Sequence, residues 1–483
     1  MKERIALGFG DNIDYEIIWN SKVIENLIIQ YDIHNDELDI NRVVNSERDL
    51  VSSILSFLKS GTGGERIVSS SAILEYFSQN FEKKITLGGT PVRAAIAMRK
   101  LGYTSALHLV TINDHVRKLI PQDSPYVCSN IKDGSYPHLI VQFGKDTCVK
   151  AGDIDICTSQ ANRIIYHNDD DNIIMNLNED FSNLITEART LLISGFNAMK
   201  SEALLTNRLE SLLRIMAKLP KDALVYYEDA GYYEPRFRQL IFRTLARNLN
   251  IVSLNEDELQ GHLDRRLDLL NVFEIKEALG DLQKLIPVPV IVVHSMYWAL
   301  AYGEKVVSFS KALKGGITMA TTRFCYGDDF TVENYKKIES LSPNKEGALF
   351  ADALKKLLGN KICCVPVAHV EQLNATTIGL GDAFVGGFLP ALLSSERAVD
   401  DPVSTRVRLH SAIDNFPRNQ RRKDSRFGWG VYEPDETHHR VQQTRIQPAH
   451  VDGFHVGMAW RRGVTRLAHD RADEAGIQSQ AET

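Results

Sequence analysis

Short apolar segments alternate with amphipathic segments of helical period along residues 1–400, and this alternation restricts the possible folds more than any other feature of the chain. Pro91 in the first turn and Gly102 just past the end delimit one expected helix, and Pro235 opens another that runs to about residue 250. Apolar strands separated by such helices form parallel sheets with helices on both faces. The sequence therefore predicts an α/β fold with a doubly wound, mainly parallel sheet. The expected strands cover residues 5–9, 106–110, 191–193, 224–227, 251–254, 290–293 and 362–367.

The stretch 137–177 departs from this pattern. Its apolar residues stand among turn-forming residues and Asp/Asn clusters, as Ile154 and Ile156 do. Such a pattern is typical of short antiparallel strands. We expect a small β-rich lid here, inserted into a single kinase-sized domain that covers residues 1–400.

The composition of the chain changes near residue 400. Residues 1–400 contain 24 Lys and 19 Arg, whereas residues 401–483 contain one Lys and 12 Arg, together with six of the 14 His. No apolar repeat is sustained there, so we expect 401–483 to be a poorly ordered Arg/His/Gln-rich C-terminal tail. A partner-binding patch around the basic cluster 418–426 is one alternative. Read-through or a frame change in the coding sequence is another.

The charge, the cysteines and the hydropathy exclude several classes of protein. A net charge of -6 gives no basic footprint for nucleic acid. The six cysteines show no CxxC spacing, so we expect neither a zinc site nor a disulfide framework, and a cytoplasmic location fits. The most apolar run, residues 285–293, is broken by Pro287 and Pro289 and is far shorter than the roughly 20 residues that span a bilayer. We expect no nucleic-acid partner and no membrane partner.

The strongest chemical signal is a carboxylate flanked by glycines, Asp382, near the end of the alternating region. Gly379 and Gly381 precede it, and an apolar helix follows it directly. Glycines let backbone N–H groups turn towards one point, and a helix N-terminus adds positive potential there, so the segment predicts an anion hole. A carboxylate at its edge can take a proton from a hydroxyl that attacks a phosphoryl group. The alternative is a turn in which Asp382 only caps the helix.

Polar residues follow four of the expected strands. Asp14, Glu228 and His294 each come after a different strand, and Asn255 and Glu258 follow a fourth. Ligands of open parallel sheets bind beyond the carboxyl ends of the strands, and hard carboxylate oxygens suit magnesium. The alternative for Asn255 and Glu258 is a capping box at a helix start.

Together these motifs resemble those of the ADP-dependent glucokinase and phosphofructokinase family, within the ribokinase-like superfamily. The resemblance extends from residue 5 to about residue 395. It implies a ribokinase-like fold and a phosphotransferase with an alcohol group as acceptor, of the ADP-dependent hexokinase type. It also implies that Asp382 is the base and that the amides of Gly379 and Gly381 form the anion hole.

Three segments resemble the family's acceptor site. Residues 8–14 are similar to its first-strand sugar motif, and residues 88–90 to the Gly-Gly-Asn segment under the sugar. Glu65 lies where the family has an acidic residue associated with glucose rather than a sugar phosphate. The acceptor contacts that the resemblance implies are Asn12, Asp14, Glu65, Gly88, Gly89 and Thr90.

Other segments resemble the family's metal and nucleotide sites. Residues 226–228 look like its His-x-Glu element and residues 255–258 like its Asn-x-x-Glu element, both tied to Mg²⁺. The resemblance implies ADP as the phosphoryl donor and Mg²⁺ as the cofactor. The implied metal residues are Glu228, Asn255 and Glu258, and the implied nucleotide residues are Arg163, His294, Tyr297 and Thr377, with Arg163 gripping the phosphate.

Two residues depart from the family's pattern. Thr90 stands in place of the usual Asn, and Tyr226 in place of the His. A hydroxyl replaces an amide that offers both donor and acceptor, so Thr90 bears on which sugar is bound. Tyr226 bears only on the outer shell of the metal site, because Glu228 remains.

We therefore expect a magnesium-dependent sugar kinase of carbohydrate metabolism and glycolysis, which transfers a phosphoryl group from ADP to a hexose hydroxyl. The favoured reaction converts glucose to glucose 6-phosphate. The alternatives are an ADP-dependent phosphofructokinase, an ATP-dependent ribokinase-like carbohydrate kinase and, in another class, a regulator that binds sugar and nucleotide without turnover. The expected partners are a small-molecule sugar and a nucleotide, and a monomer fits them.

Overall fold

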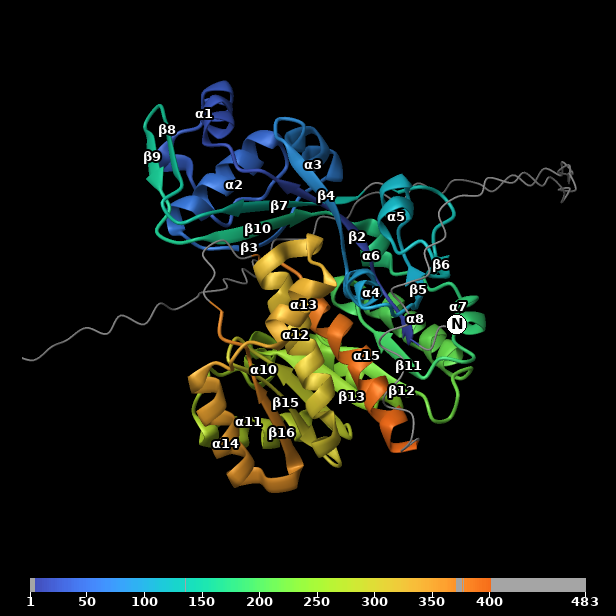
Figure 1. Cartoon of the computed structure of the whole chain (residues 1–483). Helices are drawn as coiled ribbons and strands as arrows, with labels where there is room; N and C mark the ends of the chain where they lie inside the picture. Colours follow the sequence, from blue (N-terminus) through green and yellow to red (C-terminus); the bar gives the residue numbers. More distant parts are fainter. Residues whose placement is uncertain (1–4, 135, 371–375, 377, 401–483) are drawn as a thin grey trace, which may run out of the picture. The chain divides into compact units, whose positions relative to one another are not determined.

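The computed structural model describes residues 5–134, 136–370, 376 and 378–400, which form one compact unit built around two sheets (Figure 1). The expected tail, 401–483, and Thr377 lie outside the described residues. Within the described part of the chain, no helix has both the length and the apolar character needed to cross a bilayer.

The larger sheet has nine strands, and all its described strands except β15 run parallel. The predicted mainly parallel, doubly wound sheet is therefore confirmed. In spatial order the strands are β16 (Ile362–Pro366), β15 (Trp298–Gly303), β14 (Val290–His294), β13 (Ile251–Asn255), β12 (Leu224–Glu228), β11 (Thr190–Ile193), β1 (Ile5–Leu7), β5 (Ala106–Leu109) and β6 (Tyr126–Cys128).

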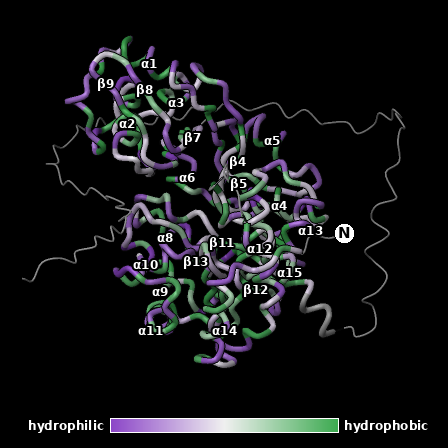
Figure 2. Tube along the Cα trace, turned by 60° about the vertical axis from the view of Figure 1, so that its left-hand side comes forward, coloured by the Kyte–Doolittle hydropathy of each residue, from purple (hydrophilic) through white to green (hydrophobic). Residues whose placement is uncertain are grey.

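Helices cover both faces of the larger sheet. One face packs on α8 (Glu202–Met216), α9 (Pro235–Leu245), α10 (Glu256–Leu263), α11 (Val272–Leu285) and α14 (Lys345–Leu358). The other face packs on α4 (Thr90–Lys100), α5 (Asp114–Leu119), α12 (Ser310–Tyr326) and α15 (Leu380–Asp400). Figure 2 shows hydrophobic and hydrophilic residues alternating along these helices, as expected for helices with one buried side. Three further helices are α6 (Asp170–Ile174), α7 (Phe181–Leu184) and α13 (Val332–Glu339).

The smaller sheet has five strands, in the order β3 (Gly64–Ile67), β10 (Asn162–His167), β7 (Pro137–Phe143), β2 (Asn12–Ile17) and β4 (Lys83–Gly88). It is mixed, because β3 pairs parallel to β10 and β7 parallel to β2, whereas the other two pairs are antiparallel. One face packs on α1 (Ser21–Gln30), α2 (Glu47–Ser60) and α3 (Ser71–Ser78), which lie together on one side of the sheet (Figure 1). Asp14, His138 and Thr86 are partners in the strand pairing and share the other face.

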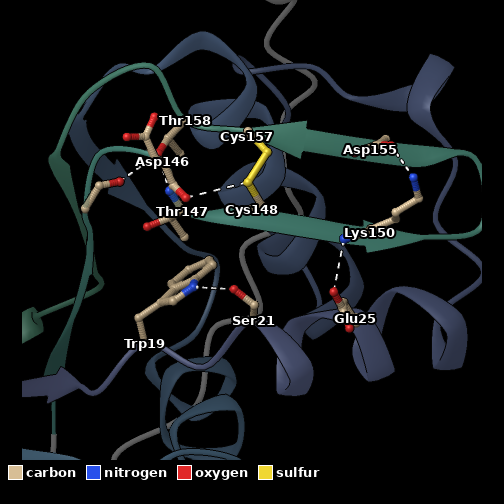
Figure 3. The surroundings of a disulfide bond; sticks show 11 residues. Trp19, Ser21, Glu25, Asp146, Thr147, Cys148, Lys150, Asp155, Cys157 and Thr158 are labelled. Carbon is tan, nitrogen blue, oxygen red and sulfur yellow. Dashed lines mark hydrogen bonds and ion pairs between the residues drawn. A yellow bond between two sulfur atoms is a disulfide. The ribbon is translucent and has the colours of Figure 1, made fainter.

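The hairpin of β8 (Cys148–Ala151) and β9 (Ile154–Cys157) contains a disulfide between Cys148 and Cys157 (Figure 3). The expectation of no disulfide was wrong, because the hairpin register makes these two residues direct partners. Cysteine spacing along the sequence does not reveal a cross-strand pair. The hairpin lies against α1, where Glu25 accepts a hydrogen bond from the Lys150 backbone N–H at 3.1 Å.

Candidate active site

Three polar residues end neighbouring strands at one edge of the larger sheet. Glu228, Asn255 and His294 are the last residues of β12, β13 and β14, and these strands run parallel, so their carboxyl ends meet at this edge. Glu228 is buried, and its Oε1 lies 3.3 Å from Nε2 of His294. The strand-end positions expected for these three residues agree with the structure, whereas Asp14 lies within β2 of the smaller sheet. Their roles stay predictions.

The N-terminus of α15 lies against this edge. Gly379, with φ +62°, makes the turn into the helix, a conformation that L side chains rarely adopt. A Cβ built on Gly381 would lie 3.5 Å from Cε1 of His294 and 3.8 Å from Oε1 of Glu228. The His294 ring stacks on Phe384 with 4.7 Å between ring centroids. The glycine turn therefore adjoins both strand-end side chains, and the first-turn N–H groups of a helix have no partner within it.

Asp382 stands in the first turn of α15, where a side chain of α4 holds it. The Thr90 hydroxyl donates to Oδ1 of Asp382 at 2.8 Å, and Nε of Arg93 lies 3.7 Å from Oδ2. The carboxylate keeps about a fifth of its surface exposed, at 22%. It is thus oriented by neighbours and still reachable by a substrate.

Asp14 is the third residue of β2 and is buried. Arg93 donates from Nη2 to Oδ2 of Asp14 at 2.6 Å, and Asn12 donates from its side-chain amide to Oδ1 at 2.6 Å. Gly89, with φ +87°, brings the start of α4 so close to β2 that a Cβ there would lie 2.5 Å from the carbonyl oxygen of Gly10. Asn12, Asp14, Gly89 and Thr90 are therefore neighbours of Asp382.

Gly88 also belongs to this group, because a Cβ there would collide with the side chain of Asn12. Gly88 and Asn12 are partners in the pairing of β4 with β2. Five of the six predicted acceptor residues thus surround one point between β2, β4 and α4.

Glu258 and Asn255 form the capping box that the sequence left open as the alternative. Asn255 accepts from the Asp257 and Glu258 N–H groups, and Oε2 of Glu258 accepts from the Asn255 N–H at 2.8 Å. Burial, followed by the nearby carboxylates of Asp229 and Glu228, raises the pKa of Glu258 well above its usual value. Although Glu258 caps the helix, its carboxylate still lies close to those of Asp229 and Glu228.

Glu228 is the second residue whose surroundings suit a bound cation. Its Oε2 is buried and has no hydrogen-bond partner among the described residues. Asp229 is also buried beside it and pairs with His262 at 2.7 Å. Across residues 5–134, 136–370, 376 and 378–400, no three His, Cys, Asp or Glu side chains are arranged to hold a metal ion directly. A cation bound through water remains compatible with this arrangement.

Glu65 and Arg163 lie farther along the smaller sheet that also contains Asp14, on the neighbouring strands β3 and β10. His167 lies 3.1 Å from Oε1 of Glu65, and its ring is 5.0 Å from the ring of His138. The surrounding protein partly desolvates Glu65 and favours its protonation, although 63% of its side chain stays exposed. The hydrogen bond from His167 and the charges of His167, His138 and Arg163 outweigh this effect and lower the pKa of Glu65.

Tyr297 lies in the turn between β14 and β15, where its carbonyl accepts from the Val367 N–H. No described contact joins it to the residues around Asp382. Arg163 and Tyr297 therefore stay predictions as nucleotide contacts.

Sequence reasoning missed Arg93, His138 and His167. Arg93 is one charged residue on the buried side of a helix otherwise lined by Val92, Ala94 and Ala95, and this contrast was the available signal. No sequence pattern indicated His138 and His167, because only the pairing of β7 with β10 brings them together.

The chain is similar to known proteins in sequence pattern and in fold. The model of the ADP-specific phosphofructokinase/glucokinase conserved region matches residues 3–389. A phosphofructokinase from Pyrococcus horikoshii OT3, solved with AMP, is 19% identical with a TM-score of 0.66, covering 82% of this chain and 99% of that one. A search of curated protein sequences finds no match.

Two further solved structures are similar to the chain. The last common ancestor of ADP-dependent phosphofructokinases from Methanosarcinales is 15% identical, with a TM-score of 0.65, and the match covers 81% of this chain and 94% of that one. An ADP-dependent kinase in complex with fructose 6-phosphate and ADPβS is 14% identical, with a TM-score of 0.62 and the same coverages. At these identities the likeness shows the fold. Because the family model spans most of the chain, from the first strand to the helix that carries Asp382, this protein belongs to the ADP-specific phosphofructokinase/glucokinase family.

Proposed function

We propose that the chain is a magnesium-dependent kinase that transfers the terminal phosphoryl group of ADP to a hydroxyl of a hexose. The observation that carries the proposal is the setting of Asp382, a reachable carboxylate at a glycine turn and helix N-terminus, next to the strand-end residues Glu228 and His294. Family membership supports ADP as the donor.

Asp382 would act as the general base. Its Oδ1 is occupied by the Thr90 hydroxyl, which leaves Oδ2 to accept the proton of the attacking hydroxyl. The N–H groups of the glycine turn and the first turn of α15 would stabilise the negative charge on the transferring phosphoryl group. The acceptor would be held by Asn12, Asp14 and the backbone at Gly88 and Gly89.

The residues at the sheet edge fit a magnesium ion held through water. Glu228 offers a buried oxygen without a partner, and Glu258 adds a second carboxylate with a raised pKa. These residues would hold the ion, which would neutralise phosphate charge when bound. The nucleotide contacts we propose are Arg163, His294, Tyr297 and Thr377, with His294 placed at the glycine turn by its stacking on Phe384.

Glucose is the acceptor that Glu65 favours, because a carboxylate beside the acceptor repels a phosphate group. A phosphorylated hexose is the second candidate. The observation in its favour is that His167, His138 and Arg163 surround Glu65 with positive or protonatable groups, and burial of His138 is outweighed by Asp169, which raises the pKa of His138.

A panel of phosphoryl-transfer assays tests the proposal. ADP and ATP are each combined with glucose, fructose 6-phosphate and buffer alone, and AMP and sugar phosphate are measured directly. We expect AMP and a phosphorylated hexose in equal amounts with ADP only. Turnover with ATP alone would assign an ATP-dependent kinase, and binding of both ligands without turnover would assign a regulator.

A further inference from the structure

We propose that Arg93 is a positioning residue for phosphoryl transfer, which fixes the acceptor-side carboxylate Asp14 relative to the base Asp382. This inference rests on the proposed function. It adds a residue that neither the sequence motifs nor the family match assigns.

The geometry places one guanidinium between the carboxylates of Asp14 and Asp382, with Oδ1 of Asp328 also 4.0 Å from Nη1. Nη2 of Arg93 is 2.6 Å from Oδ2 of Asp14 on β2, and Nε is 3.7 Å from Oδ2 of Asp382 on α15. Asp14 belongs to the smaller sheet, whereas α15 covers the larger sheet. Arg93 thereby joins the strand that carries the acceptor contact to the helix that carries the base.

The same guanidinium supports the glycine turn. A Cβ on Gly379 would lie 2.9 Å from Cδ, 3.0 Å from Nη1 and 3.2 Å from Nε of Arg93. The turn therefore packs directly on the arginine, without room for a side chain between them. Movement of Arg93 would shift the turn and the first residues of α15.

Arg93 is held firmly enough to act in this way. Its side chain is 5% exposed, and it projects from the first turn of α4 beside Thr90, which is three residues earlier on the same helix face. Burial disfavours the charged form, but Asp14, Asp382 and Asp328 outweigh burial and raise the pKa of Arg93 above its usual value. The arginine is charged at any working pH, so it holds its carboxylates constantly.

The shape of the side chain matters as much as its charge. A guanidinium is planar and presents donors in several fixed directions, whereas an ammonium is a single point. Lysine at this position keeps the charge but can meet only one of the two carboxylates well. The Arg93→Lys variant therefore separates positioning from simple charge balance.

The first experiment measures kcat and the acceptor KM of Arg93→Lys. Arg99→Lys is the matched control, because Arg99 is on the same helix, partly exposed, and paired with Asp123 at 2.9 Å. We expect Arg93→Lys to lower kcat at least ~10-fold, whereas Arg99→Lys stays within about twofold of the parent. An unchanged kcat in folded Arg93→Lys would overturn the proposal.

A double-mutant cycle with Asp382→Asn makes the test specific. If Arg93 acts through Asp382, Arg93→Lys should change kcat by less than about twofold once Asp382 is Asn. A general structural defect would instead multiply the two losses, and that result would overturn the proposal. If Asp382→Asn alone keeps parental turnover, the proposed function is wrong. That outcome differs from a cycle in which the two losses multiply, which contradicts only the role of Arg93.

A second variant covers the case in which Arg93→Lys does not fold. Asp14→Asn leaves Arg93 in place but removes the negative charge of its closest partner. We expect kcat at saturating acceptor to fall at least ~5-fold, in addition to a rise in acceptor KM, because the released guanidinium no longer holds Asp382 in place. A rise in acceptor KM with parental kcat would show that Arg93 does not couple Asp14 to Asp382, and would overturn the proposal.

Discussion

The hydroxyl of Thr90 donates a hydrogen bond to Oδ1 of Asp382 at 2.8 Å, so the residue that departs from the family's Asn touches the candidate base. The resemblance assigned Thr90 to the sugar. In the structure it also links the first turn of α4 to the first turn of α15. A change at this position therefore acts on the base as well as on the acceptor.

Asp382→Asn should lower kcat by at least ~100-fold, the range expected for loss of a positioned general base. An amide cannot accept the proton of the hydroxyl, but it can keep the hydrogen bond from Thr90. Steady-state kinetics and calorimetric sugar binding check this, with Asp352→Asn on the exposed side of α14 as control. Near-parental turnover would exclude Asp382 from the mechanism.

Thr90→Val should lower kcat roughly tenfold, because the hydrogen bond to a charged carboxylate is lost while the side-chain volume is nearly kept. Thr90→Ser retains the hydroxyl and should recover most of the activity. Measurement of kcat for the parent, Thr90→Val and Thr90→Ser tests this expectation. A loss of kcat in Thr90→Ser with parental kcat in Thr90→Val would show that the methyl group, and not the hydroxyl, is what matters.

Glu228→Gln should raise the magnesium concentration needed for half-maximal activity by more than tenfold, since it removes charge from the buried oxygen that lacks a partner. Glu258→Gln should raise it less, because the glutamine can still accept from the Asn255 N–H. Magnesium titrations of both variants at fixed ADP test the order. If Glu258→Gln has the larger effect, Glu258 rather than Glu228 is the main magnesium residue.

Glu258→Gln should also change the pH dependence of stability in metal-free buffer. The folded protein holds the Glu258 proton to a higher pH than the unfolded chain does, so the contribution of this group to stability falls as pH rises above about 4.5. The variant should therefore gain thermal stability relative to the parent at pH 8 and not at pH 4. Thermal denaturation at both pH values measures this, and an equal difference at both would contradict it.

Glu65→Ala should increase the kcat/KM ratio of fructose 6-phosphate to glucose at least ~10-fold. The substitution removes the negative charge and leaves His167, His138 and Arg163 to attract a phosphate group. Parallel kinetics with both acceptors give the ratio. A ratio that does not move would show that Glu65 does not select the acceptor.

The part of the fold that was predictable is the part set by local pattern. Apolar strands and helix-delimiting residues such as Pro91 and Pro235 indicated the larger sheet and its helices, and strand ends indicated the edge with Glu228 and His294. The link from Asp14 through Arg93 to Asp382 was not predictable, because those residues are far apart in the chain and only tertiary packing brings them together. The disulfide between Cys148 and Cys157 was not predicted for a similar reason, since the pairing of β8 with β9 brings the two residues together.

All five strands of the smaller sheet lie within the first 167 residues, whereas the larger sheet is complete only with β16 at residues 362–366. As the chain leaves the ribosome, the smaller sheet and its three helices can therefore assemble before β11, the pairing partner of β1, has been synthesised. The nascent chain would carry Asp14 in a finished strand long before Asp382 is synthesised. The site around Asp14 and Asp382 can therefore assemble only after β16, the last strand of the larger sheet, has been synthesised.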